Sequence, residues 1–198
     1  MNHGFVKVAA AVPNVQVADC FYNITQIEKL MRKAADKGVQ IMAFPELSVT
    51  GYTCLDLFQQ DLLLNSAETA LLQLAENTAD LPLLAFVGAP LRTDNKLINA
   101  AIAIQEGKIL GVVPKTYLPN YKEFQEKRWF TSSNDLDNDF IEIGDRFYPL
   151  QKQMIIIADE VAVGVEICED LWMPVPPSSE LAMLGANIIV NLSASNEL

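Results

Sequence analysis

Three residues of this sequence have side chains that could together perform nucleophilic catalysis. Glu46, Lys115 and Cys168 each follow a short apolar run of strand length, at residues 39–44, 109–113 and 161–167. Residues at the carboxyl ends of strands are where α/β sheets place their sites. Cys168 could act as a nucleophile if Glu46 accepts the thiol proton and Lys115 stabilises the thiolate and an oxyanion.

Each of these residues also has a simpler interpretation. Glu46 could be a solvated loop acid, Lys115 a surface lysine, and Cys168 a buried core residue. A free thiol has a pKa of about 8.5, so a nucleophilic cysteine needs a base or a cation nearby. The single histidine, His3, lies in the N-terminal tail, which argues against a Ser-His-Asp triad, a Cys-His pair or a multi-histidine metal site. The residues alone leave the catalytic and the simpler interpretations open.

Composition narrows the class of protein. The chain has 198 residues, of which 51% are hydrophobic and 20% charged, as in globular proteins. Its net charge of -11, with no Lys or Arg after Lys152, argues against nucleic acid and anionic membranes as partners. The three cysteines, Cys20, Cys54 and Cys168, show no CxxC spacing, so neither a disulfide framework nor a zinc site is supported. The apolar runs are too short to span a membrane and no signal-peptide pattern is present, so we expect a cytoplasmic protein.

The elements that must position these residues alternate between strand and helix at first. Ile27, Leu30, Met31 and Ala34 have the spacing of an amphipathic helix that ends before Gly38. The other elements expected in this half are strands at residues 5–12, 39–44 and 83–87 and helices at 57–64 and 68–76. The opening of the chain is therefore α/β.

After Pro90 the pattern becomes rich in strands. Ile98–Ile104 and Ile109–Val113 flank a turn and predict an antiparallel hairpin. Further strands are expected at residues 140–143, 154–158, 161–167 and 187–192, with a short helix at 180–184 capped by Ser178 or Ser179. Helices on both sides of mixed strands predict an α-β-β-α sandwich with mixed sheets.

The last predicted strand ends close to the end of the sequence. A domain seldom stops directly after a buried strand, so we expect residues 1–198 to form one domain that is incomplete at its C-terminus. The alternative is that the terminus folds onto the surface.

Four longer motifs resemble a known family. The sequence resembles the nitrilase superfamily of carbon–nitrogen hydrolases and, more narrowly, the glutamine amide-transfer domain of glutamine-dependent NAD synthetases. The motifs lie at Phe44–Phe58, Pro114–Tyr121, Glu126–Phe130 and Glu166–Ser179. The resemblance implies a nitrilase-like α-β-β-α sandwich. One departure is Lys122-Glu123, where the family more often has a small residue and an apolar one.

The resemblance also implies roles for individual residues. It makes Glu46 the general base, Lys115 the cation that stabilises the oxyanion, and Cys168 the nucleophile. Glu126 matches a further glutamate that helps to position the lysine. Five more positions match residues that line the glutamine pocket: Tyr52, Tyr121, Glu169, Trp172 and Ser195. Taken as residues alone, these five could equally be core, turn or surface positions.

The resemblance implies that the chain is the glutamine amidohydrolase half of an NAD synthetase. Ammonia would leave glutamine through a cysteine thioester and would amidate nicotinate adenine dinucleotide. This half would need no metal or organic cofactor, whereas ATP and magnesium would belong to a synthetase domain that this sequence lacks. A homo-oligomer is also expected. Two alternatives stay open: a free-standing nitrilase-type amidase or carbamoylase, and a non-catalytic assembly module.

Overall fold

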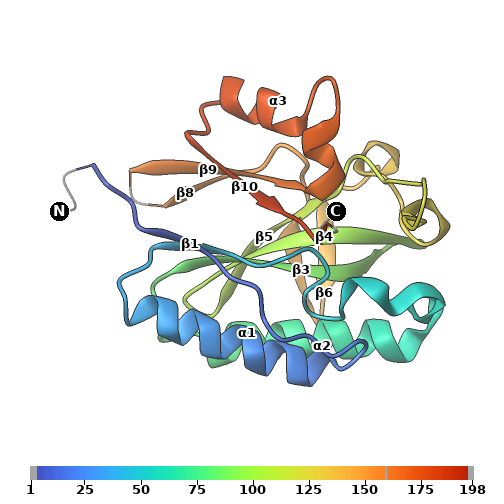
Figure 1. Cartoon of the computed structure of the whole chain (residues 1–198), viewed down its shortest axis with the longest axis horizontal. Coiled ribbons are helices and arrows are strands. Elements are labelled where there is room, and N and C mark those ends of the chain that lie inside the picture. Colours follow the sequence, from blue (N-terminus) through green and yellow to red (C-terminus); the bar gives the residue numbers. More distant parts are fainter. Residues whose placement is uncertain (1–3, 159, 196–198) are drawn as a thin grey trace.

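A computed structural model describes residues 4–158 and 160–195, so His3 lies outside the described residues. A five-stranded sheet forms the centre of the first half, with two helices on one face (Figure 1). The helices are α1 (Cys20–Ala35) and α2 (Asp61–Asn77). In sheet order the strands are β1 (Val8–Ala10), β2 (Ile41–Ala43), β3 (Leu84–Thr93), β4 (Lys96–Gln105) and β5 (Lys108–Pro114). β1, β2 and β3 run parallel, and β3, β4 and β5 form an antiparallel meander.

A smaller sheet packs on the other face of the first (Figure 1). Its strands lie in the order β10 (Ile188–Leu192), β9 (Val161–Ile167) and β8 (Ile155–Ala158). α3 (Pro177–Met183) covers its outer face (Figure 1). A hairpin of β6 (Phe140–Ile143) and β7 (Arg146–Pro149) connects the two halves. Short 3₁₀ segments complete the fold: η1 (Tyr52–Gln59), η2 (Glu126–Arg128), η3 (Ser133–Asp135) and η4 (Cys168–Trp172).

Two separate apolar layers hold these elements together. Along β3, Ala85 and Val87 face the layer formed with α1 and α2. Leu84 and Phe86 face the layer between the two sheets, as the alternation of side chains along a strand requires. The predicted α-β-β-α sandwich with mixed sheets is therefore confirmed. Within the described residues, no helix is both long enough and apolar enough to cross a bilayer.

Several predicted element boundaries are wrong. The helices expected at 57–64 and 68–76 are one helix, α2, preceded by η1. β3 continues through Pro90, which a strand tolerates there because β2 pairs with β3 only over Leu84–Phe86. β7 was not predicted. α3 begins at Pro177, which suits the first turn because that position needs no N–H donor.

The capping prediction for α3 is also wrong. Neither Ser178 nor Ser179 caps this helix, because Pro176 occupies the N-cap position. The Ser178 N–H instead donates to Glu166 Oε2 at 3.0 Å. A carboxylate from β9 therefore satisfies the N-terminus of α3.

Candidate active site

Glu46 lies in a loop that follows β2 and rests directly on β3. A Cβ atom at Gly88 of β3 would lie 2.3 Å from the Leu47 nitrogen and 2.6 Å from Glu46 Cα. The Val49 N–H donates to the Gly88 carbonyl at 3.0 Å. Glycine is therefore required at position 88, because a side chain there would push away the loop that carries Glu46.

Lys115 follows β5 and is fully buried beside two carboxylates. Its Nζ lies 2.8 Å from Glu46 Oε2 and 2.7 Å from Glu126 Oε1. Asn99 of β4 connects the loops, since its Nδ2 donates to Glu46 Oε2 at 2.9 Å and its carbonyl accepts the Lys115 N–H at 2.9 Å. Tyr52 of η1 donates its hydroxyl to Glu126 Oε1 at 2.7 Å.

The charges of this cluster control its protonation. Burial lowers the pKa of Lys115, but the charges and hydrogen bonds of Glu46 and Glu126 outweigh burial and raise that pKa above its ordinary value. Lys115 is therefore a permanent cation. Burial raises the pKa of Glu126, and Lys115 opposes this shift.

Cys168 comes from the second sheet, at the turn where β9 ends. Its φ of +47° lies in the left-handed region, which is uncommon for a residue with a side chain. Ser193 Oγ donates to Cys168 Sγ at 3.4 Å, and Ser195 Oγ lies 3.7 Å from the same sulfur. The Ala194 N–H donates to Glu46 Oε1 at 3.1 Å. The segment after β10 therefore contacts both the thiol and Glu46.

The surroundings of Cys168 keep its thiol protonated. Burial raises the pKa of this thiol, and the charge of Glu46 raises it further. The Ser193 hydroxyl and the charge of Lys115 lower it, without reversing the shift. A nucleophilic attack by Cys168 at neutral pH therefore needs a base that removes the proton during the reaction.

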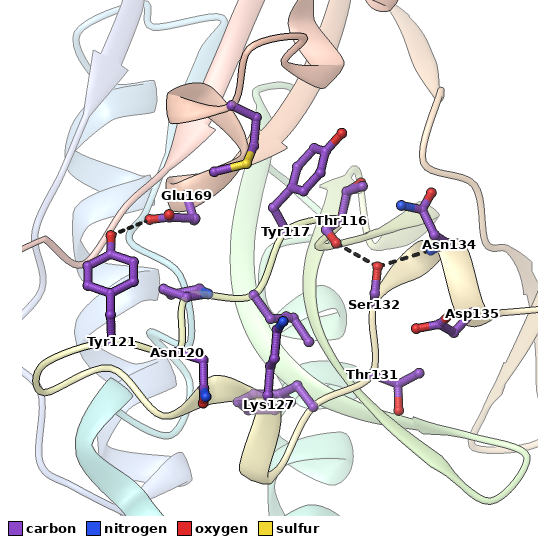
Figure 2. Close-up of a pocket in the computed structure, with 14 residues that line it drawn as sticks. Thr116, Tyr117, Asn120, Tyr121, Lys127, Thr131, Ser132, Asn134, Asp135 and Glu169 are labelled. Atoms are coloured by element: carbon purple, nitrogen blue, oxygen red, sulfur yellow. Dashed lines mark hydrogen bonds between the residues drawn. The ribbon is translucent and has the colours of Figure 1, made fainter.

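A cavity of about 750 Å³ opens beside this cluster (Figure 2). Its lining includes Thr116, which follows Lys115, and Glu169, which follows Cys168. On one side the Tyr121 hydroxyl points at Glu169 and donates to its Oε2 at 2.8 Å (Figure 2). A carboxylate at the cavity wall can bind a ligand ammonium group.

The structure gathers most of the predicted site residues. Glu46, Lys115 and Glu126 form one hydrogen-bonded cluster, with Cys168 at its edge. Tyr52 contacts this cluster through Glu126, Ser195 lies near the Cys168 sulfur, and Tyr121 pairs with Glu169 in the cavity wall. Trp172 is 69% exposed at the end of η4. No group of His, Cys, Asp and Glu that could hold a metal occurs among the described residues.

Sequence reasoning missed four residues that shape the site. Asn99 and Gly88 lie in apolar strands, where the sequence gives no sign of their contacts with the Glu46 loop. Ser193 stands in a motif, Asn-Leu-Ser-Ala-Ser, that could have indicated it. Asp170 is buried and accepts three backbone N–H groups, although an acidic pair after a cysteine resembles a solvated turn.

Comparison with known proteins agrees with this geometry. Residues 7–197 match the model of the carbon-nitrogen hydrolase family. The chain belongs to that family. Among curated proteins, this carbon-nitrogen hydrolase is 40% identical over 98% of its length to the glutamine-dependent NAD(+) synthetase of Mycobacterium leprae. It spans 29% of that protein.

Solved structures give the same picture of this carbon-nitrogen hydrolase. A glutamine-dependent NAD(+) synthetase from Cytophaga hutchinsonii superposes with a TM-score of 0.83 and 27% identity, over 96% of this chain and 30% of that one. A carbon-nitrogen hydrolase from Helicobacter pylori shares the fold, with a TM-score of 0.73, 19% identity and coverage of 98% and 61%. The resemblance found in the sequence motifs is therefore confirmed.

Proposed function

We propose that this chain hydrolyses the side-chain amide of glutamine, with Cys168 as nucleophile, Glu46 as general base and Lys115 as the oxyanion-stabilising cation. One observation carries the proposal: these three side chains converge from two sheets on one buried cluster. The similarity to glutamine-dependent NAD(+) synthetases supports glutamine as the substrate. The thiol is protonated at rest, so the reaction begins with proton transfer from Cys168 to Glu46.

The first half of the proposed reaction forms a thioester. The Cys168 thiolate attacks the glutamine Cδ, and the electron pair of the carbonyl moves to its oxygen. Lys115 Nζ and a backbone N–H stabilise this oxyanion. Glu46 returns the proton to the amide nitrogen, the C–N bond breaks, and ammonia leaves. Lys115 keeps its own proton throughout, because the two flanking carboxylates raise its pKa.

The second half releases glutamate. Glu46 removes a proton from water, the resulting hydroxide attacks the thioester carbonyl, and the C–S bond breaks. The Cys168 thiolate takes the proton back from Glu46, which restores the starting state. These steps use a thiol, a carboxylate and an ammonium group, so we propose that this half of the protein works without a metal or organic cofactor.

We propose that the cavity beside the cluster binds the amino-acid end of glutamine. Glu169 lies in its wall and is positioned by the Tyr121 hydroxyl, so it can pair with the α-ammonium group of the substrate. This arrangement favours glutamine over simple aliphatic amides, which lack the charged end.

We further propose that residues 1–198 act as the glutaminase domain of an NAD synthetase, in which the ammonia amidates nicotinate adenine dinucleotide. ATP and magnesium then belong to the synthetase domain. The names of the relatives support this proposal, together with their length, of which this chain spans about 30%. The cytoplasmic location and the homo-oligomer stay predictions.

The experiment that tests the proposed function compares amide substrates. Ammonia release is measured with glutamine, asparagine, propionamide and an N-carbamoyl amino acid, for the wild type and for Cys168→Ala and Glu169→Gln. We expect glutamine to be preferred, Cys168→Ala to be inactive, and Glu169→Gln to raise the KM for glutamine while propionamide turnover stays the same. A preference for propionamide or the carbamoyl compound would contradict glutamine as the substrate.

A further inference from the structure

The proposed catalytic residues belong to two different sheets. Glu46 and Lys115 follow strands of the five-stranded sheet, whereas Cys168 follows β9 of the smaller one. Ladder hydrogen bonds fix strands within one sheet, but the two sheets meet through an apolar layer. Apolar burial is non-directional, and catalytic groups must be held to within about 0.5 Å. The site therefore needs directional contacts that cross from one sheet to the other.

Asp170 makes such contacts. Its side chain is buried, and its residue is 2% exposed. Oδ1 accepts the N–H groups of Thr116 and Tyr117 at 3.1 Å and 2.7 Å, and Oδ2 accepts the N–H of Ile167 at 3.0 Å. One carboxylate thus joins the two residues after Lys115 to the residue before Cys168.

We propose that Asp170 is a positioning residue that holds the Lys115 loop against the Cys168 turn. The inference rests on the proposed function, because it concerns the distance between the cation and the nucleophile of that reaction. Asp170 acts through its neighbours. Its carboxylate oxygens are occupied by backbone N–H groups, so substrate binding is left to other residues.

The same turn offers a comparison within one strand. Glu166, two residues before Cys168, is 1% exposed and also accepts a backbone N–H, from Ser178. It also accepts from Asn191 Nδ2 at 3.3 Å, so it ties β9 to α3 and β10 on its own side of the sandwich. Asp170 reaches across to the other sheet instead. Burial equal to that of Glu166 therefore serves a different connection.

The charge of Asp170 is costly to keep. Burial raises its pKa to about 6, although the N–H groups of Tyr117, Ile167 and Thr116 and the charge of Lys115 lower it. A buried charge that stabilised only the fold could be replaced by a well-packed apolar residue without loss. Its three aligned donors are what an ionised carboxylate accepts and an apolar side chain does not.

The test compares Asp170→Asn with Glu166→Gln as the matched control. The Asn side chain has one acceptor oxygen, so its NH₂ group must face at least one of the three backbone N–H groups. We expect the Lys115 loop to shift. Because the charge of Lys115 lowers the pKa of Cys168, the thiol of Asp170→Asn should titrate at a higher pH.

The readout is the pH dependence of Cys168 alkylation by iodoacetamide, followed by peptide mass mapping. We expect the midpoint to rise in Asp170→Asn and to stay at the wild-type value in Glu166→Gln, which loses thermal stability only. Glutamine turnover should fall about 100-fold in Asp170→Asn at equal folded concentration. A folded Asp170→Asn variant with the wild-type midpoint and turnover would overturn the proposal. If the wild type does not hydrolyse glutamine, the proposed function fails, whereas alkylation still tests Asp170.

A second measurement needs no variant. In the wild type, the amide protons of Thr116, Tyr117 and Ile167 should exchange slowly with solvent, because Asp170 accepts all three. Lys122, an exposed residue further along the same loop, provides the fast reference. Exchange of Thr116 and Tyr117 as fast as that of Lys122 would contradict the proposed connection, even if Asp170→Asn fails to fold.

Discussion

The two sheets contribute very different halves of the site. On the five-stranded sheet, Glu46, Lys115 and Glu126 form a buried, charged cluster with contacts of 2.7–2.8 Å. On the smaller sheet, Cys168 sits in a left-handed turn, and its closest hydrogen-bond donor, Ser193, lies 3.4 Å from the sulfur. The base and the cation are therefore pre-organised, while the nucleophile is held by longer and weaker contacts.

This difference explains how a protonated thiol can serve as a nucleophile. The charged half does not convert Cys168 into a thiolate in advance, because Glu46 raises the thiol pKa while Lys115 lowers it. The same carboxylate is an acceptor for the proton once a substrate is present. Rigidity in the first half and late activation in the second half are two parts of one mechanism.

The largest effect is expected from Lys115→Met. This change leaves the carboxylates of Glu46 and Glu126 buried without their shared cation, which typically costs about 3–5 kcal/mol. Urea unfolding should therefore give a much lower free energy of unfolding, and glutamine hydrolysis should be lost. Lys29→Met, on the exposed face of α1, is the control. Equal stability of the two variants would break the picture of a charge-balanced half.

Glu46→Gln should separate the base from the scaffold. The amide oxygen of Gln can still accept from Lys115 Nζ and Asn99 Nδ2, so the fold should persist. Loss of the general base should reduce turnover by roughly 10²–10⁴-fold. The measurement is glutamate release at equal folded concentration, with Glu76→Gln on the exposed side of α2 as control. Unchanged turnover would rule out Glu46 as the base.

Gly88→Ala should damage the first half through its backbone. The new methyl group would meet the backbone of Leu47 and Glu46, which cannot move aside as a side-chain tip can. We expect a loss of about 1–3 kcal/mol in stability and about 100-fold in turnover. The control is Gly164→Ala in β9, where the nearest contact is the flexible end of Leu181 at 3.0 Å. Similar turnover in both variants would contradict a role for Gly88 in placing Glu46.

Tyr52→Phe should have the smallest effect. It removes one hydrogen bond to Glu126 Oε1, while Lys115 continues to contact both carboxylates. A net loss of about 0.5–1.5 kcal/mol in stability is expected, with less than about tenfold loss in turnover. Thermal unfolding and initial rates check this prediction. A loss of turnover as large as that of Glu46→Gln would show that Tyr52 touches the substrate directly.

The sequence predicted the fold better than the contacts within the site. Hydrophobic periodicity indicated most strands and both long helices, because burial on one face is a local property of the sequence. Motif resemblance identified Glu46, Lys115 and Cys168. Asn99 and Asp170 could not be found in this way, since their partners lie 53 or more residues away and depend on how the two sheets pack.

Glycine positions show the same limit. Gly88 looks like an ordinary small residue in a buried strand, and only the packing of the Glu46 loop on β3 reveals why it is needed. The cap of α3 was mispredicted for a related reason. Ser178 has the composition of a cap, but Glu166 from β9 reaches its N–H. Long-range contacts replaced the local solution that the sequence favoured.

The measurement that tests the central claim most directly is labelling with a chloroketone analogue of glutamine, followed by peptide mass mapping. The account predicts that Cys168 is labelled, that glutamine protects it, and that Glu46→Gln slows the labelling. Cys20 and Cys54 should remain unlabelled, because both are buried and burial raises their thiol pKa values. Labelling of Cys54 or Cys20 in preference to Cys168, or labelling that glutamine does not prevent, would contradict the account.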